Sequence, residues 1–216
     1  SLHDALPIWK GATSNNKAEW RSTYGESPEY VLFGDWQVCF QTYADLYKLD
    51  PDTIKIARAR EVMEYQMSTS KLDYWHWVDA LYMVMPVMVK MYDITKNPLY
   101  LEKLHQYLTV TDSIMYDREV GLYYRDAKYP YPFHKTINGK KDFWSRGDGW
   151  AFAAFAKVLK QLPAEDKYRE EYITRFQTMA KSIAACQQPE GYWTRSLIDP
   201  EQAPGPETSG TALFTY

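Results

Sequence analysis

The feature that most constrains this chain is an alternation of two kinds of predicted helix. A helix that is apolar over most of its surface is followed by a turn rich in proline or acidic residues, and then by an amphipathic helix. The turns are Leu49-Asp50-Pro51, Lys96-Asn97-Pro98 and Leu162-Pro163-Ala164. Because apolar helices have to be buried and amphipathic helices can cover them, the alternation predicts an all-α toroid of helical hairpins around a central axis.

Seven helices are predicted from the spacing of apolar residues. The third, from about Trp75 to Thr95, is apolar nearly all round and contains Pro86, which removes a backbone hydrogen bond and predicts a kink. Leu122 to Arg125 is predicted to be a short strand, followed by a loop from Tyr129 to Lys141. The other helices are predicted near residues 35–49, 52–67, 97–116, 149–162, 166–187 and 209–216.

The two ends of the chain differ in character. Residues 1–30 are polar and aperiodic, and we expect a poorly structured or artefactual segment there, with a partial helical domain over 31–216. The last predicted helix stops at Tyr216 in the middle of an inner-helix pattern, so we expect a fragment of a longer domain. The first residues do not form a signal peptide, but the sequence has no initiator Met, so cytoplasmic and exported locations both stay open.

Composition excludes several classes of function. The formal net charge of −3 gives no basic excess for nucleic acid or an anionic membrane, and no apolar run is long enough to span a bilayer. The four histidines and two cysteines have no metal-site spacing, so we expect neither a metal nor a cofactor. Aromatic residues make up 16% of the chain, which suits a core or a sugar-binding cleft lined with rings.

Asp79 is the strongest candidate for a catalytic group. It lies in the apolar and aromatic run Trp75 to Met83, where a charge is costly unless it is paired, hydrogen-bonded or protonated. Burial raises the pKa of an acid and lets it act as a general acid near neutral pH. If the helix starts near Asp73, Trp75, Asp79 and Met83 share one face of it. A buried aspartate that caps the helix or pairs with a core arginine is the alternative.

A second group of candidates lies in Phe143 to Trp150. Its two glycines permit the close approach of a ligand or unusual backbone angles. Arg146 is a forked donor that suits the carboxylate of an acidic sugar, and Trp144 and Trp150 flank it. The alternative is a tight entry into a helix, capped by Asp148, with Arg146 paired to Asp148 or Asp79.

A third group, Pro206 to Thr211, includes Ser209 and has the small hydroxyl residues of a helix N-terminus. A plain helix cap is the simpler interpretation of this segment. Acids also occur at three entries into inner helices, near Asp35, Asp79 and Asp148, and a toroid would bring these entries to one rim. Their convergence supports a site there more strongly than any one of them.

These three motifs, Trp77 to Pro86, Trp144 to Trp150 and Pro206 to Thr211, carry a family resemblance. From about Asp35 onward the chain resembles the unsaturated rhamnogalacturonyl hydrolases of glycoside hydrolase family 105, with the unsaturated glucuronyl hydrolases of family 88 as close relatives. The motifs occur in the family's order and with suitable spacing. The resemblance implies an (α/α)6 barrel, a six-hairpin fold that agrees with the alternating helices.

The resemblance also implies an activity and roles for residues. Enzymes of this family remove a 4,5-unsaturated uronic acid from the non-reducing end of lyase-generated oligosaccharides, such as pectin fragments, by hydrating its double bond. Asp79 would then be the general acid and base, and Trp77 would stack on the unsaturated ring. Arg146 and Trp150 would bind the sugar, and we place Met83, Trp144 and Ser209 in the same substrate site.

The sequence departs from the family pattern at two positions. Many relatives have two aspartates at the first inner helix, whereas this chain has Asp35-Trp36, so Asp35 is our candidate for the second carboxylate. Some relatives have histidine where this chain has Arg125, so we expect Arg125 to contact substrate and to affect the choice of sugar. The alternatives are a glucuronyl hydrolase acting on glycosaminoglycan fragments, a lyase of the same fold, and a non-catalytic sugar-binding protein.

Overall fold

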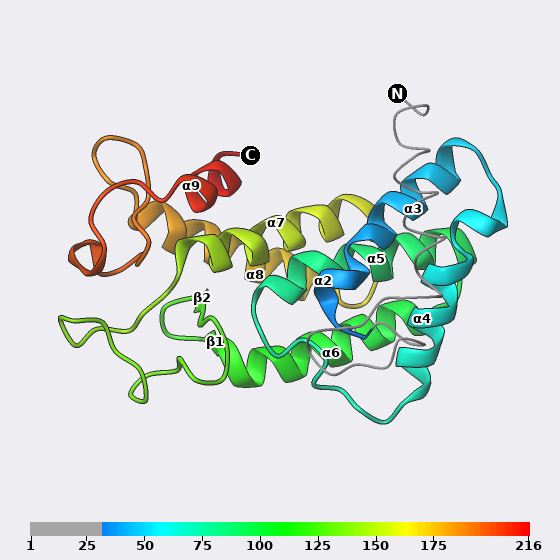
Figure 1. The fold of residues 1–216 in the computed structure, drawn as a ribbon, viewed down its shortest axis with the longest axis horizontal. Helices are drawn as coiled ribbons and strands as arrows, with labels where there is room; N and C mark the ends of the chain where they lie inside the picture. Colours follow the sequence, from blue (N-terminus) through cyan, green and yellow to red (C-terminus); the bar gives the residue numbers. More distant parts are fainter. Residues whose placement is uncertain (1–31) are drawn as a thin grey trace.

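The computed structural model describes residues 32–216, and this part is mostly helical (Figure 1). Two short strands, β1 (Tyr116–Asp117) and β2 (Leu122–Tyr123), form an antiparallel pair in which Tyr116 faces Tyr123. The helices and strands are α2 (Gly34–Gln37), α3 (Cys39–Leu49), η1 (Thr53–Lys55), α4 (Ala57–Ser68), α5 (Asp79–Thr95), α6 (Leu99–Met115), β1 (Tyr116–Asp117), β2 (Leu122–Tyr123), α7 (Ser145–Gln161), α8 (Arg169–Ala185), η2 (Pro200–Gln202) and α9 (Thr208–Thr215).

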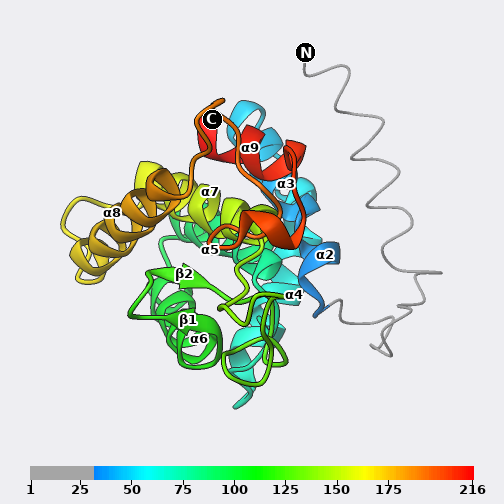
Figure 2. The ribbon, with the colours of Figure 1, turned by 90° about the vertical axis from the view of Figure 1, so that its left-hand side faces the viewer.

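Helix α5 forms the centre of the described structure. It packs against α7 on one side and α6 on another, while α2 and α3 also contact it and α9 lies on α7 (Figures 1 and 2). Most residues of α5 are buried, as expected for a helix that is apolar nearly all round, and the helix continues through Pro86. The alternation of buried and covering helices predicted from the sequence is therefore confirmed.

Three predicted helix boundaries were wrong. The helix expected from Asp35 to Leu49 is divided at Val38 into α2 and α3. The start of α5 is Asp79 rather than the neighbourhood of Trp75, and α7 begins at Ser145 rather than Gly149. Local periodicity cannot detect such shifts, because backbone contacts between distant segments decide them.

Those distant contacts lie just before α5 and at the start of α7. The backbone N–H of Val78 donates to the carbonyl of Arg125 at 2.9 Å, so the residues before α5 pair with the segment after β2. At the start of α7, the backbone of Trp144 forms an isolated antiparallel β-bridge with that of Ser196. The N–H of Ser145 donates to the carbonyl of Arg195 at 2.9 Å. Both contacts bring residues from later in the chain to the N-terminal ends of α5 and α7.

A buried ion pair joins α6, α8 and β2. Arg175 on α8 donates to the carboxylate of Asp112 on α6 at 2.7 Å and to the hydroxyl of Tyr123 on β2 at 2.7 Å. The guanidinium also lies 3.6 Å from the centre of the Tyr116 ring. The outer helix α8 is thus held to the inner layer by a polar cluster as well as by apolar packing.

The expectation for residues 1–30 falls outside the described residues, so it stays a prediction. Among the helices of residues 32–216, none is both long enough and apolar enough to span a bilayer.

Candidate active site

Asp79 is the first residue of α5, and its carboxylate is partly buried. Burial raises the pKa of this carboxyl, and the negative charge of Asp35 raises it further. The positive charges of Arg146 and Arg125 oppose the increase, but the pKa still lies above its usual value. Asp79 therefore combines a tendency to hold a proton with cations near enough to act on its charge.

Asp35 reaches this position because α2 packs closely against α5. A Cβ atom on the neighbouring Gly34 would lie 3.2 Å from the Trp77 ring and 3.3 Å from Val84, so glycine allows this close approach. Asp35 is exposed as a whole residue, but partial desolvation of its carboxyl raises the pKa of this group as well. The structure thus brings together the two carboxylates that we proposed from the sequence, although they lie 44 residues apart in the chain.

We expect Asp35→Asn to change the pH dependence of activity in the whole protein. Without the charge of Asp35, the pKa of Asp79 should fall and less of the protonated acid should be present near neutral pH. Activity that needs protonated Asp79 should therefore decline at a lower pH than in the wild-type protein. A profile of kcat/KM against pH measures this shift, and an unchanged alkaline limb would contradict it.

The two tryptophans before α5 have different environments. Trp77 is half-buried, and its ring stacks on Phe33 with centroids 4.2 Å apart and an interplanar angle of 12°, so Phe33 covers one face. A sugar ring could therefore stack on the other face only. Trp75 is buried against Tyr107 in the core, so the prediction that it shares a helix face with Asp79 and Met83 was wrong. Met83 lies one turn after Asp79 on α5 and is half-buried.

Arg146 lies in the first turn of α7 and is exposed. Its guanidinium stacks over the Trp144 ring at 4.2 Å from the ring centre. No carboxylate of residues 32–216 lies within ion-pair distance of it, so the alternative of a pair with Asp148 or Asp79 is wrong for the described structure. Trp150, one turn further on, is half-buried and contacts the Tyr82 ring of α5 at 4.6 Å.

The glycines around Asp148 have a structural role rather than a ligand-binding one. A Cβ on Gly147 would lie 2.7 Å from Val78, and a Cβ on Gly149 would lie 2.9 Å from Leu213, so these glycines let α7 approach its protein neighbours. Asp148 is fully buried and does not cap α7, because the helix begins three residues earlier. Its carboxylate accepts a 2.8 Å hydrogen bond from the N–H of Tyr123, and burial raises its pKa well above the usual value.

The third motif is a helix cap, as the simpler interpretation predicted. Glu207 is the N-cap of α9 and accepts hydrogen bonds from the N–H of Gly210 and the hydroxyl of Ser209. It also accepts a 3.2 Å bond from the hydroxyl of Ser145, which joins the starts of α7 and α9. Burial alone would raise the pKa of Glu207, but these hydrogen bonds lower it. Ser209 therefore has a structural partner, and its contact with substrate stays a proposal.

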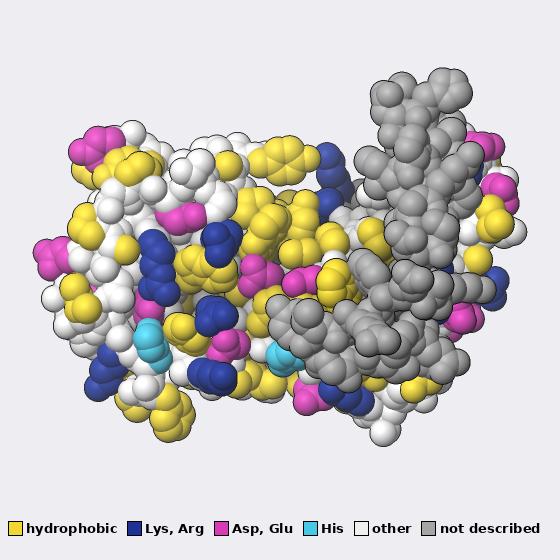
Figure 3. Space-filling view, in the orientation of Figure 1, with side chains coloured by type: hydrophobic (Ala, Val, Ile, Leu, Met, Phe, Trp, Pro, Cys, Tyr) yellow, Lys and Arg dark blue, Asp and Glu magenta, His cyan; other side chains and the backbone are white. Residues whose placement is uncertain are grey.

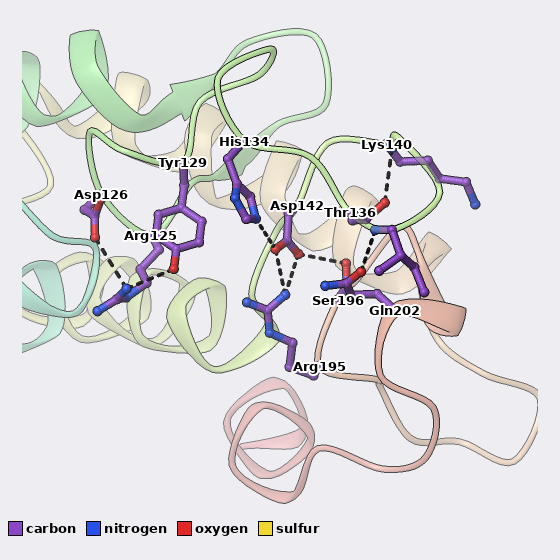
Figure 4. Close-up of polar contacts among 11 residues, drawn as sticks. Arg125, Asp126, Tyr129, His134, Thr136, Lys140, Asp142, Arg195, Ser196 and Gln202 are labelled. Carbon is purple, nitrogen blue, oxygen red and sulfur yellow. Dashed lines mark hydrogen bonds and ion pairs between the residues drawn. The ribbon is translucent and has the colours of Figure 1, made fainter.

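A polar network that none of the sequence motifs predicted lies beside these residues (Figure 4). The buried carboxylate of Asp142 accepts hydrogen bonds from Arg195 at 2.6 and 2.7 Å, pairs with His134 at 2.9 Å and accepts from the hydroxyl of Ser196 at 3.0 Å. Burial alone would raise the pKa of Asp142, but these partners lower it. The signal in the sequence was weak, because Asp142 and Arg195 lie 53 residues apart.

Arg125 lies near the start of the segment between β2 and α7, and Asp142 lies near the end of that segment. The Arg125 side chain is exposed. Its guanidinium donates to the hydroxyl of Tyr129 at 3.1 Å and lies 3.7 Å from the carboxylate of Asp126. Hydrogen bonding to Tyr129 raises its pKa most, with smaller contributions from Asp126 and Asp79.

Among the described residues, no group of three His, Cys, Asp or Glu side chains is arranged to hold a metal ion.

Comparison with known proteins identifies the family of this chain. The sequence model of glycosyl hydrolase family 88 matches residues 8–216, which is most of the chain. The chain belongs to glycosyl hydrolase family 88. The sequence motifs had indicated this family beside family 105. A solved family 105 glycoside hydrolase and a solved possible member of family 105 share the fold of this chain, at 20% and 18% identity. The expected helical barrel is therefore confirmed.

Three relatives of this family 88 chain are informative. A solved structure, "Glycosyl hydrolase family 88 from Bacteroides vulgatus", is 96% identical to this chain with a TM-score of 0.91. The match covers all of this chain and 62% of the length of that structure's chain. A second structure, which is named a polysaccharide lyase, is 70% identical to this chain with a TM-score of 0.90. The match covers 99% of this chain and 63% of the length of the lyase chain. An unsaturated 3S-rhamnoglycuronyl hydrolase of Alteromonas sp. (strain LOR) is 35% identical over 66% of this chain. This chain spans about a third of that hydrolase's length, since the match covers 34% of it.

Proposed function

We propose that the whole protein is a glycoside hydrolase that removes a 4,5-unsaturated uronic acid from the non-reducing end of lyase-generated oligosaccharides. The observation that carries the proposal is Asp79, an acid whose pKa is raised by burial and by Asp35, with two arginines acting on its charge. Membership of family 88 and the named activity of the Alteromonas relative support it.

The proposed reaction is hydration of the C4=C5 double bond. Protonated Asp79 gives its proton to C4, and the positive charge that develops toward C5 is then captured by water. The Asp79 carboxylate takes a proton from that water, so a hydroxyl is added at C5 and the acid is regenerated. The hemiketal formed at C5 opens to a ketone, which leaves a hemiacetal at C1. Breakdown of that hemiacetal to an aldehyde releases the rest of the oligosaccharide as an alcohol. The scheme uses one carboxylate twice and differs from the usual pair of carboxylates in glycosidases.

Arg146 and Arg125 would bind the carboxylate of the unsaturated uronate. A guanidinium presents two parallel N–H groups that match the two oxygens of a carboxylate, and both arginines are exposed next to Asp79. Trp77 and Trp150 provide half-buried ring surface for the sugar. The aglycone sugar proposed here is rhamnose, because the curated relatives are named rhamnoglycuronyl hydrolases.

The second candidate function is a lyase, which the 70% identical structure named a polysaccharide lyase favours. A uronate lyase removes the C5 proton and breaks the C4–O4 bond, so that O4 leaves with the sugar attached to it and the C4=C5 double bond is created. Neutralisation of the uronate carboxylate helps this reaction as well, so Arg125 and Arg146 suit both candidates. The two reactions differ in whether the conjugated double bond is consumed or formed.

The ultraviolet absorbance of that double bond therefore tests the proposal. We expect the whole protein to lower the absorbance of unsaturated disaccharides, with those ending in rhamnose consumed fastest and glycosaminoglycan disaccharides slowly. A rise in absorbance with saturated glucuronate-containing oligosaccharides would instead establish the lyase. Binding without any change in absorbance would support a non-catalytic protein.

A further inference from the structure

A side chain that belongs to none of the sequence motifs links α3 to the start of α5. Gln41 lies on α3 with 6% of its surface exposed. Its amide nitrogen donates to the backbone carbonyl of Tyr82 at 2.8 Å and to that of Met83 at 3.2 Å. These carbonyls belong to residues three and four positions after Asp79 on α5. The contact therefore lies one helical turn from the proposed catalytic acid.

Pro86 explains why the carbonyl of Tyr82 needs a donor from another helix. In an α-helix this carbonyl accepts a hydrogen bond from the N–H four residues later, and proline has no N–H. Because α5 continues through Pro86, the carbonyl of Tyr82 is left without its helical partner. The amide of Gln41 supplies the missing hydrogen bond.

Lys157 on α7 fixes the orientation of the Gln41 amide. Its ammonium group donates to the amide oxygen at 2.6 Å, which directs the amide nitrogen toward α5. Lys157 also donates to the hydroxyl of Tyr82 at 3.3 Å and lies 4.5 Å from the centre of the Tyr82 ring. The same ring contacts Trp150. Side chains of α3, α5 and α7 are thus joined by one set of polar contacts.

The position of α3 also determines the position of Asp35, which precedes Gln41 by six residues. The N–H of Gln41 donates to the carbonyl of Val38 at 3.1 Å, and the N–H of Val38 donates to the carbonyl of Gly34 at 3.0 Å, so no loop separates α2 from α3. Figure 3 shows acidic side chains among hydrophobic ones near the middle of the face where α2 and α5 meet in Figure 1. Movement of α3 away from α5 would move Asp35 away from Asp79.

Resting on the proposed function, we infer that Gln41 is a positioning residue of the active site, which holds the segment carrying Asp35 against the start of α5. Charged groups act on Asp79 from three elements, with Asp35 on α2, Arg146 on α7 and Arg125 after β2. Of these three, Asp35 lies on the segment that contains Gln41. Without the Gln41 contact, Asp35 should repel the charge of Asp79 less, and Asp79 should hold its proton less tightly.

The variant Gln41→Met tests this inference, because methionine is also long and unbranched but cannot form these hydrogen bonds. In the whole protein, carbon-13 NMR titration of labelled aspartate follows the Asp79 carboxyl, whose signal is identified by its loss in Asp79→Asn. We expect the pKa of Asp79 to fall, by no more than it falls in Asp35→Asn. The alkaline limb of kcat/KM for an unsaturated disaccharide should move to lower pH with it. At neutral pH kcat/KM should fall about tenfold, because small displacements of active-site groups are costly.

The double variant Asp35→Asn with Gln41→Met distinguishes positioning of Asp35 from general loosening of the fold. If Gln41 acts through Asp35, its substitution should shift the Asp79 titration much less once Asp35 is uncharged. An equal shift in the two backgrounds would overturn the inference, and so would an unchanged Asp79 titration in Gln41→Met.

A second background separates the inference from stability. Pro86→Ala restores an N–H for the carbonyl of Tyr82, so Gln41→Met should lower the melting temperature less in that background. The shift of the Asp79 titration should remain there. Loss of the shift together with the loss of stability would show that Gln41 only satisfies the carbonyl, and would overturn the inference.

The matched control is Asp45→Asn, which weakens a second polar link between α3 and α5, the ion pair of Asp45 with Lys90. It should lower the melting temperature and leave the Asp79 titration unchanged. A shift as large as that in Gln41→Met would overturn the inference, because any loosening of α3 would then have the same effect. If the wild-type protein turns over no unsaturated disaccharide, the proposed function fails, whereas the NMR titration still decides whether Gln41 positions Asp35.

Discussion

Asp79→Asn should reduce turnover of unsaturated disaccharides by at least about 100-fold, because general acid–base catalysis contributes about 10²–10⁴-fold and the amide can neither give nor take the required proton. Substrate binding should persist, since Arg125, Arg146 and the tryptophans are unchanged. The measurement is the decrease in ultraviolet absorbance, with calorimetry for binding. A variant that keeps more than about a tenth of the wild-type rate would remove Asp79 from this role.

The same variant should be more stable than the wild-type protein at neutral pH. The folded protein holds the Asp79 proton more tightly than the unfolded chain does, because burial raises the pKa of this carboxyl. Its contribution to stability is therefore fully present below the usual aspartate pKa of about 4 and is lost as the pH rises through the raised value. Asparagine carries no charge to bury at either pH. Melting temperatures measured at neutral pH and below about pH 4 should show a difference that vanishes in acid.

Arg175→Leu should destabilise the protein by about 3–5 kcal/mol, because it leaves the buried carboxylate of Asp112 without its cation. The two side chains are 9% and 5% exposed, their atoms lie 2.7 Å apart, and Tyr123 shares the cluster. Burial raises the pKa of Asp112, and the loss of Arg175, which lowers it, should raise it further. Chemical denaturation of the whole protein measures the change in the free energy of unfolding.

Two further variants separate the ion pair from simple loss of side-chain volume. The double variant Asp112→Leu with Arg175→Leu should recover much of the loss, because no charge is then left buried and unpaired. Arg60→Leu, on the exposed pair with Glu64, should leave the denaturation midpoint unchanged. A double variant as unstable as Arg175→Leu alone would show that the destabilisation comes from lost packing around Tyr116 and Tyr123.

The helical plan could be predicted from the sequence because it depends on local periodicity. The run around α5 is apolar on nearly every side, so it had to be buried, and the turns at Pro51, Pro98 and Pro163 separate it and its neighbours. Asp79 could be singled out for the same reason, since an acid within such a run is costly without a compensating partner. The resemblance carried by three short motifs then supplied an activity and residue roles.

Tertiary structure alone decided where the helices begin and which side chains meet. α5 starts at Asp79 because Val78 pairs with Arg125, and α7 starts at Ser145 because its N–H pairs with Arg195. Neither partner is near in the sequence, so no local pattern contains this information. The glycines beside Asp148 are explained by the approach of Val78 and Leu213, not by a ligand.

The sequence by itself determined that this chain folds into alternating buried and covering helices with an acid at the entrance of the most buried one. Only the tertiary structure decided that Asp35, Arg125 and Arg146 surround that acid, and that Asp142 holds Arg195 beside them. The physical reason is the separation along the sequence of the residues that interact. Helix formation and burial follow from residues a few positions apart, whereas the pKa of Asp79 and the place of each cation depend on charges that folding brings from separate helices and loops.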